Sequence, residues 1–239
     1  LFAGLFDMIT THGALDVASG MKNKAPGTPL NGAEPGDYPY YLLGGDTLAR
    51  DVFSRMVAGS FVVIRIAPLA TLFAFMVGIT LGLPAGYVGG RLDTLLSFLA
   101  NLILAFPVIL LFYLLVTPEI VETGIPSYLA VVLFLFPLIF LTVLINARYF
   151  TDPRKRTIIL ALVLIPLGWL YLSLVSDRDT PVGFLPAEID LFDIPGGILV
   201  VFVSVVFVNA PTVFRIVRGL AMDIKTRDYV AAAQTRGEG

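Results

Sequence analysis

Few residues of this chain have the type and spacing that chemistry requires. Cysteine is absent, which excludes a disulfide framework and a thiolate metal site. The pattern GxxxxGK[ST], whose backbone amides and lysine hold nucleotide phosphates, does not occur. We therefore predict no catalytic residue, no metal site and no cofactor, and we assign no role to the single histidine, His12.

The charged residues that are candidates for a functional role lie next to or within apolar stretches. Asp51 and Arg55 are four residues apart just before the first such stretch, so on a helix they can form a weak ion pair. We interpret them as solvated charges of an interfacial helix near 46–58. Arg65 lies about one helical turn inside the apolar stretch, and a charge within a membrane is a candidate functional residue. Its long side chain favours the alternative that it snorkels to the interface.

These charges border apolar segments that dominate the chain. Of 239 residues, 57% are hydrophobic and 14% are charged, whereas a soluble protein carries about 25% charged residues. The mean hydropathy is +0.87. A bilayer core requires roughly 20 apolar residues in a helix, and the sequence predicts such spans at about 61–83, 95–116, 127–147, 157–175 and 196–214. We predict an all-α polytopic membrane protein. The formal net charge of −2 gives no indication of nucleic-acid binding.

The charges of the loops predict how the spans are oriented. Residues 148–156 and 215–239 are rich in Lys and Arg, whereas residues 117–126 and 176–194 are acidic. Because cytoplasmic loops carry an excess of Lys and Arg, we place the first pair inside the cell and the second pair outside. Residues 1–60 then lie outside. This orientation requires an earlier helix, and we interpret the chain as an internal piece of a longer polypeptide, truncated at both ends.

Two local patterns near the first span are more specific than composition. Residues 43–55 read LGGDTLARDVFSR, directly before that span. In the second pattern, over 78–93, Gly78, Gly82 and Gly86 share one helix face, which allows another helix to approach closely in lipid. We interpret these small residues as helix packing.

A third pattern closes the sequence. A run of alanines follows Asp228 and precedes Arg236, so the acid lies at the N-terminal end and the base at the C-terminal end. This polarity suits the helix macrodipole, and Gly237 can end the helix. We predict a short helix on the cytoplasmic side that a soluble partner can contact.

Together and in this order, the three patterns resemble the inner-membrane permease subunits of bacterial dipeptide and oligopeptide ABC importers. The "LGTDxxGRDVxSR" segment of that family is matched by Leu43, Gly44, Asp46, Arg50, Asp51, Val52, Ser54 and Arg55. Its "GxxxGxxAGYxGGxxD" pattern is matched by Gly78, Gly82, Ala85, Gly86, Tyr87, Gly89, Gly90 and Asp93, and its "LAFP" by Leu104, Ala105, Phe106 and Pro107. The "EAAxxxG" coupling motif is approached by Ala231, Ala232, Ala233 and Gly237.

The chain also departs from the family pattern. Gly45 and Ala49 replace a Thr and a Gly, and Asn101 lies where the family often has Asp. Ala231 occupies the place of the coupling motif's Glu, so any salt bridge from that Glu is lost. Residues 117–194 contain two extra helices and an acidic loop that the usual subunit lacks.

The resemblance implies a fold, a function and a set of partners. It implies a helical bundle of the type I ABC importer kind in the bacterial inner membrane, moving peptides into the cytoplasm. A second permease subunit, two cytoplasmic ATPase subunits and an extracytoplasmic binding protein would be the partners, and the ATPases would carry the hydrolysis, so the chain would not be an enzyme. The implied ATPase-coupling residues are Asp228, Tyr229, Ala231, Ala232, Ala233, Arg236 and Gly237. Candidates for the translocation path or an interface are Arg65, Asn101 and Pro107.

The predicted organisation has four parts. They are an extracytoplasmic segment at 1–60, two core spans at 61–116, the inserted pair with its acidic loop at 117–194, and a core span with the coupling helix at 195–239. Two other functions remain open. One is a secondary transporter driven by an ion gradient, which we would expect to bury several polar groups at the midplane of the membrane. The other is a membrane scaffold without transport activity. The cargo also remains open among dipeptides, longer peptides, nickel chelates and sugar conjugates.

Overall fold

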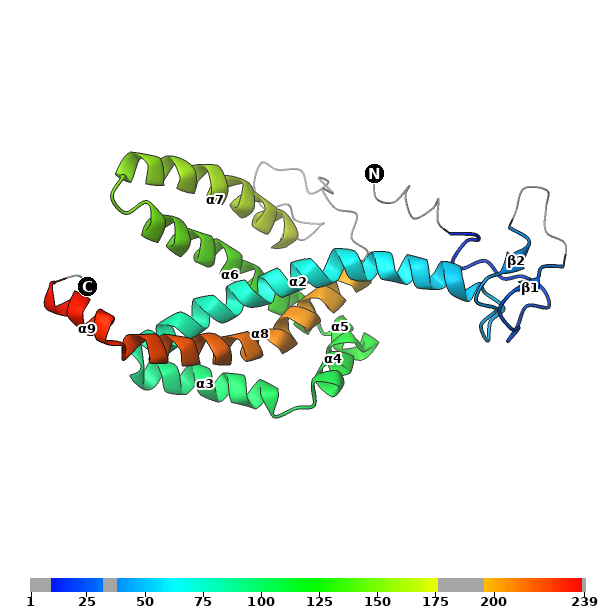
Figure 1. Ribbon diagram of the computed structural model, residues 1–239, viewed down its shortest axis with the longest axis horizontal. Coiled ribbons are helices and arrows are strands. Elements are labelled where there is room, and N and C mark those ends of the chain that lie inside the picture. Colours follow the sequence, from blue (N-terminus) through cyan, green and yellow to red (C-terminus); the bar gives the residue numbers. More distant parts are fainter. Residues whose placement is uncertain (1–9, 32–37, 176–195, 238–239) are drawn as a thin grey trace. The chain divides into compact units, whose positions relative to one another are not determined.

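The chain forms two compact units, unit 1 (Leu1–Pro68) and unit 2 (Leu69–Gly239). The computed structural model describes residues 10–31, 38–175 and 196–237 (Figure 1). Helix α2 (Val52–Val88) begins in unit 1 and ends in unit 2. The acidic loop predicted at 176–194 lies outside the described residues.

Unit 1 consists mainly of turns before helix α2. Strand β1 (Thr28–Pro29) pairs antiparallel with β2 (Tyr40–Tyr41). The buried side chains of Met21, Tyr41 and Ala49 form a small apolar cluster. With so little apolar surface buried, polar contacts must hold much of this unit together.

The helix predicted near 46–58 begins at Val52, which is later than expected. Ala49 has a φ of 61°, in the left-handed region, so the backbone before it cannot continue a right-handed helix. Asp51 is the residue before the helix, and its Oδ1 accepts a hydrogen bond from the backbone N–H of Phe53 at 3.1 Å. This is the geometry of an N-terminal helix cap.

Unit 2 is helical throughout its described residues. After α2 it contains α3 (Gly90–Leu104), α4 (Val108–Val116), α5 (Pro118–Glu122), α6 (Ile125–Arg148), α7 (Pro153–Val175), α8 (Gly196–Lys225) and α9 (Asp228–Thr235). Among the described residues, four helical stretches are long and apolar enough to cross a membrane: Val52–Val88, Tyr128–Arg148, Pro153–Leu172 and Leu199–Lys225. The predicted all-α polytopic fold is confirmed.

The remaining predicted span, 95–116, is not one straight helix. Helices α3 and α4 meet there at an angle of 83°, and together they make a fifth candidate span. The break falls at Pro107, which precedes the first residue of α4 and has a φ of −55° and a ψ of 124°. Proline lacks a backbone N–H and disfavours helical geometry in the residue before it, so α3 ends at Leu104.

Helix α8 is the centre of the packing in unit 2. It contacts α3, α4 and α6, whereas α7 packs mainly against α6. Phe73 of α2, Phe134 of α6 and Phe202 of α8 pack together, with ring centroids 5.1–5.8 Å apart. In Figure 1 the α2–α3, α6–α7 and α8–α9 connections of unit 2 lie toward the same end. This is the alternation that the loop charges predict.

Candidate functional site

The candidate site begins with the contact between α2 and α8. A Cβ added at Gly82 would lie 2.9 Å from the carbonyl oxygen of Phe214, and one added at Gly86 would lie 2.7 Å from that of Arg218. Both atoms belong to the backbone of α8, which cannot move aside as a side chain can. The predicted packing role of these small residues is confirmed, and it brings the end of α2 against α8.

A bidentate ion pair joins α8 to α3 in the same region. Arg218 donates from Nη2 to Asp93 Oδ2 at 2.7 Å and from Nε to Asp93 Oδ1. Ser97 Oγ donates a third hydrogen bond to the same carboxylate at 3.0 Å. Two parallel hydrogen bonds fix the guanidinium and carboxylate planes relative to each other. The ion pair therefore links α3 and α8 in one orientation.

Two of the three residues predicted for the translocation path or an interface lie near this contact or at the helix break. Asn101 of α3 accepts a hydrogen bond on Oδ1 from Arg215 Nη2 of α8 at 3.0 Å. Pro107 lies at the bend between α3 and α4. The third, Arg65, belongs to α2, and its side chain lies outside the described part of the chain. Asn101 thus adds a second polar link between α3 and α8.

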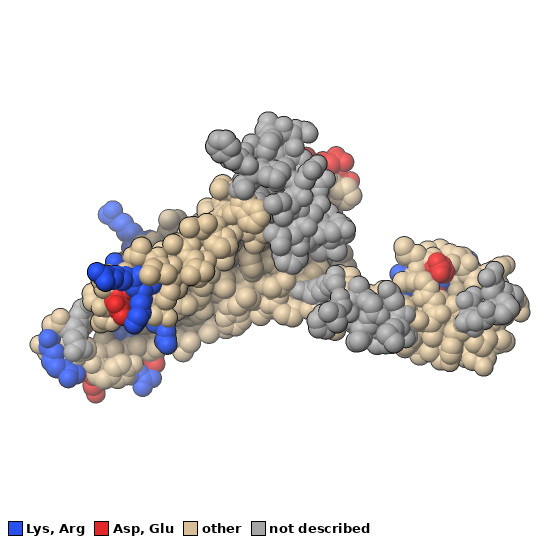
Figure 2. Space-filling view, turned by 90° about the horizontal axis from the view of Figure 1, so that it is seen from above, with Lys and Arg blue, Asp and Glu red and all other residues tan. Residues whose placement is uncertain are grey.

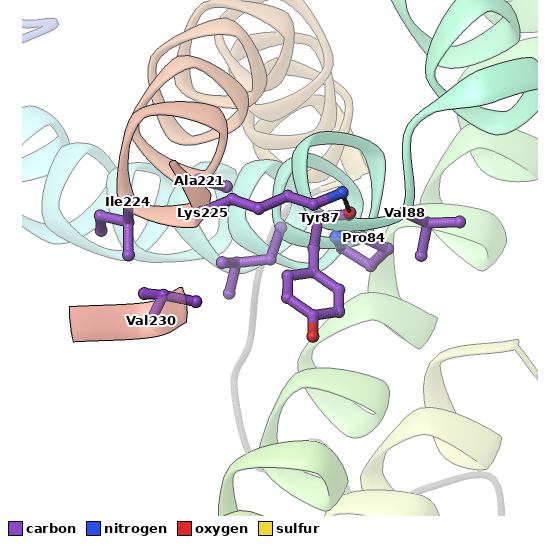
Figure 3. A pocket seen from close by; sticks show the side chains of 8 residues that line it. Pro84, Tyr87, Val88, Ala221, Ile224, Lys225 and Val230 are labelled. Carbon is purple, nitrogen blue, oxygen red and sulfur yellow. Dashed lines mark hydrogen bonds between the residues drawn. The ribbon is translucent and has the colours of Figure 1, made fainter. Parts of the chain in front are cut away.

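The side chain of Lys225 links the C-terminal end of α8 to the C-terminal end of α2. Its Nζ donates to the carbonyl oxygen of Tyr87 at 2.6 Å and lies 5.5 Å from the centroid of the Tyr87 ring. A cation at the C-terminal end of a helix interacts favourably with the exposed carbonyl groups there. Figure 3 shows this contact at the edge of an apolar groove. The groove has a volume of about 490 Å³ and is lined by Leu83, Pro84, Tyr87, Val88, Ala221, Ile224, Lys225 and Val230.

Helix α9 follows directly and is largely exposed. It begins after Arg227, whose backbone is extended, and Asp228 lies in its first turn. Tyr229 is 63% exposed, whereas Val230 lines the groove. Gly237 has a φ of 80° and donates its backbone N–H to the carbonyl oxygen of Gln234 at 3.0 Å. The predicted short helix and its glycine stop are confirmed.

The predicted coupling residues therefore lie together on one short element. Asp228, Tyr229, Ala231, Ala232 and Ala233 belong to α9, and Arg236 and Gly237 follow it. Sequence reasoning gave no role to Lys225, Ile224 or Val230, which join this element to α8 and α2. One sequence signal for Lys225 is that it is a base in the last turn of a long helix.

In unit 1, the interpretation of Asp51 as a solvated charge is wrong, and the possible ion pair between Asp51 and Arg55 does not form. Asp51 is fully buried, and its Oδ2 accepts hydrogen bonds from Ser54 Oγ at 2.7 Å and Thr11 Oγ1 at 3.0 Å. Arg55 pairs with Asp46 instead. Because Asp51 precedes the helix as its cap, its side chain turns back to the free backbone N–H groups rather than along the helix surface.

His12, to which the sequence gave no role, belongs to the same network. Its Nδ1 lies 3.2 Å from Asp51 Oδ2, and its Nε2 lies 2.9 Å from the carbonyl oxygen of Tyr38. Its backbone N–H donates to Ser54 Oγ at 3.1 Å. His12 lies 39 positions before Asp51 and 42 positions before Ser54 in the sequence. No local spacing could have indicated these contacts.

Hydrogen bonds keep both carboxylates of this region ionised. The pKa of Asp46 is lowered from 3.8 to about 2, chiefly because the backbone N–H of Arg50 donates to it, with further bonds from Leu48 and Arg55. Burial tends to raise the pKa of Asp51, but hydrogen bonds from Ser54, His12 and Thr11 outweigh burial and lower it. The two acids therefore act as fixed acceptors that order the turn before α2.

The structure explains why residues 45 and 49 differ from the family pattern. A Cβ at Gly45 would lie 1.8 Å from the carbonyl oxygen of Met21, so a threonine does not fit this backbone. Ala49 adopts the left-handed conformation that favours glycine, and its methyl group is buried beside Met21 and Tyr41.

Comparison with known proteins finds relatives over part of the chain. The chain is 36% identical over 103 residues to the dipeptide transport system permease protein of Haemophilus influenzae, covering 39% of this chain and 35% of that one. It is 39% identical over 71 residues to the glutathione transport system permease protein of Pectobacterium atrosepticum, covering 30% and 24%. For the nickel transport system permease protein of Escherichia coli the identity is 33% over 76 residues, covering 32% and 27%.

These matches span about a third or less of the length of the curated relatives. No family model matches the chain. No solved structure matches it either. The predicted resemblance to permease proteins of such transport systems is confirmed.

Proposed function

We propose that this chain is part of the permease subunit of an ABC importer that moves peptides across the bacterial inner membrane. The similarity to permease proteins of dipeptide, glutathione and nickel transport systems supports the class of function. The observation that supports the mechanism is that the exposed helix α9 directly follows the long helix α8, which contacts α3, α4 and α6.

In this proposal α9 is the surface that a cytoplasmic ATPase subunit contacts. Helix α9 is eight residues long and none of its residues is buried, so its side chains are available to a partner. Its connection to α8 is short, and Arg227 Nη2 donates to Asp223 Oδ2 at 2.6 Å across that connection. A displacement of α9 is therefore passed to α8 rather than absorbed by a loop.

From α8 the displacement reaches the helices that would line the transport path. The pair of Arg218 and Asp93 carries it to α3, and the glycine face of α2 moves with α8 because their backbones touch. Helix α3 leads to the bend at Pro107, where α4 turns away by 83°. We propose that this bend, together with Asn101 and Arg65, lies on the translocation path or at the interface with a second permease subunit.

ATP would be bound and hydrolysed by two partner subunits, and an extracytoplasmic binding protein would deliver the cargo. Closure of the ATPases on ATP would shift α9 and α8, and so switch the bundle between its two openings. Because Ala231 stands where the coupling motif has Glu, contact with the ATPase would depend on shape and on Asp228, Tyr229 and Arg236 rather than on that salt bridge.

The side of the membrane on which α9 lies is tested first. Residues 1–239 contain no cysteine, so Thr235→Cys introduces the single thiol of this part of the protein at the exposed end of α9. We expect a membrane-impermeant thiol reagent to label it in inverted vesicles and to leave it unlabelled in intact cells. Labelling in intact cells would contradict the proposal.

The coupling role is tested in the complex, after co-purification of the full-length protein in detergent and identification of its partners. Gly237→Leu places a side chain where φ is 80°, which strains the end of α9. In the reconstituted complex we expect ATP hydrolysis to continue while uptake falls severalfold and membrane insertion remains normal. Gly59→Leu, at a helical glycine with open space around it, is the matched control and should leave uptake unchanged.

Other outcomes separate the alternatives. Normal coupling in Gly237→Leu would remove α9 from the mechanism. Uptake that follows an ion gradient, in a preparation without an ATPase, would instead indicate a secondary transporter. A stable complex that moves no cargo in any preparation would indicate a scaffold.

A further inference from the structure

The hairpin formed by α6 and α7 has a surface that the proposed transport function does not use. In the membrane-span stretch of α7 no residue is buried, compared with 44% in that of α8. Within the described residues, helix α7 packs mainly against α6, and the rest of its surface is not covered by another described helix to the same extent. Between the two helices lies a groove of about 420 Å³, lined by Leu138, Ile139, Thr142, Val143, Leu164 and Gly168.

Basic residues flank the turn that joins these two helices. Arg148 is the last residue of α6, and Arg154, Lys155 and Arg156 lie in the first turn of α7. Asp152 is the single acid of residues 148–156. Lys155 Nζ lies 2.9 Å from Asp152 Oδ2, and within the described part of the chain no carboxylate pairs with the three arginines. Figure 2 shows Lys and Arg side chains gathered at this end of unit 2, next to a stretch without charge. The helix ends beside this turn therefore form a positively charged region that attracts anions.

The groove lies within the depth of one lipid leaflet from the basic helix ends. Val143 lies five residues before Arg148, about 8 Å along α6, and Leu164 lies eight residues after Arg156, about 12 Å along α7. One leaflet of the hydrocarbon core is about 15 Å thick. Phe150, in the turn, is 77% exposed, as expected for an aromatic side chain at the membrane interface.

We propose that this hairpin binds an anionic phospholipid, with the phosphate at Arg148, Arg154 and Arg156 and an acyl chain in the groove. Guanidinium groups bind phosphate oxygens in a bidentate manner, and the apolar groove suits an alkyl chain. Gly168 leaves space for that chain, because a Cβ added there would meet no atom within 4 Å. The inference rests on the membrane-spanning fold and does not depend on transport or on ATPase partners.

The headgroup contact is tested on the full chain purified in detergent, titrated with phosphatidylglycerol or with phosphatidylcholine of the same acyl chains and followed by native mass spectrometry. We expect phosphatidylglycerol to bind more tightly, and Arg154→Gln with Arg156→Gln to weaken its binding roughly tenfold. Lys22→Gln with Lys24→Gln removes the same charge from exposed residues of unit 1 and should change nothing. Equal binding of the two lipids, or equal losses in the two double variants, would overturn the proposal.

The acyl contact is tested by filling the groove. Gly168→Leu occupies the open space and should weaken phosphatidylglycerol binding severalfold, whereas Gly59→Leu, a helical glycine with equally open surroundings, should not. Unchanged binding in Gly168→Leu would overturn the acyl-chain site. Inorganic phosphate should not displace the lipid at equal concentration. Displacement by phosphate would indicate a site for a free anion and would also overturn the proposal.

Discussion

Unit 1 and unit 2 are held together by different kinds of contact. In unit 1, Asp46 accepts hydrogen bonds from the backbone N–H groups of Leu48 and Arg50. Asp51 accepts them from Ser54 and from Thr11, which lies 40 positions earlier. In unit 2, α2 and α8 approach so closely at Gly78, Gly82 and Gly86 that their backbones leave no room for a side chain. The first kind of contact depends on charge and the second on volume.

The difference follows from the surroundings of each unit. Between membrane helices there is no gain from removing apolar surface from water, so close packing of small residues must hold them together. In the turns of unit 1 the apolar cluster is small, and hydrogen bonds to charged groups contribute about 1.5–3 kcal/mol each. A change of volume should therefore damage unit 2, and a change of charge should damage unit 1.

The largest effect is expected from Gly82→Leu. Its Cβ alone would lie 2.9 Å from the Phe214 carbonyl oxygen and 3.0 Å from Val217 Cβ. Overpacking costs about 1–3 kcal/mol where side chains can move, and here the obstacle is backbone, so we expect a loss of about 3 kcal/mol or more. Thermal unfolding of the full chain in detergent, followed by the fluorescence of its single Trp, measures it.

Gly168→Leu is the matched control for this prediction. It makes the same substitution in a helix of the same unit, but at a position with no neighbouring atom within 4 Å. We expect its unfolding temperature to stay close to that of the unmodified chain. If both variants unfold at the same lowered temperature, the added side chain itself, rather than the contact between α2 and α8, is responsible, because leucine has a higher helix propensity than glycine.

A smaller and more local effect is expected from Asp51→Ala. The buried hydroxyl of Ser54 and the side chains of Thr11 and His12 lose their common acceptor. Leaving buried donors unsatisfied costs about 1–3 kcal/mol. Hydrogen exchange should show faster exchange over residues 10–31 and 38–51, with α8 unchanged. Equal acceleration in α8 would contradict the separate origins of stability in the two units.

Apolar length and glycine spacing are local properties, so the spans and the packing face of α2 could be predicted from the sequence. The identity of the facing helix could not be predicted, because the residues that meet Gly82, such as Phe214, lie far along the sequence. The size of the bend after α3 could not be predicted, because an apolar stretch with Pro107 inside it fits one kinked span as well as two separate helices. For α9, the charge polarity and Gly237 were sufficient to predict the helix and the residue at which it ends. The groove beside α9 could not be predicted, because residues of three separate helices line it.

The smallest effect concerns Asp46, whose side chain is 16% exposed to solvent. Its pKa of about 2 in the folded chain lies below its ordinary value of 3.8. The charged form is therefore favoured by folding, and its contribution is fully present above pH 3.8 and lost as the pH falls toward 2. Asp46→Asn should lower the exchange protection of unit 1 at neutral pH, and the difference from the unmodified chain should shrink between pH 4 and pH 2.

The contact between α2 and α8 contains no titrating group at Gly78, Gly82 or Gly86, so it provides the reference within the same molecule. A difference that persists undiminished at pH 2 would mean that the shape of the Asp46 side chain, rather than its charge, orders the turn.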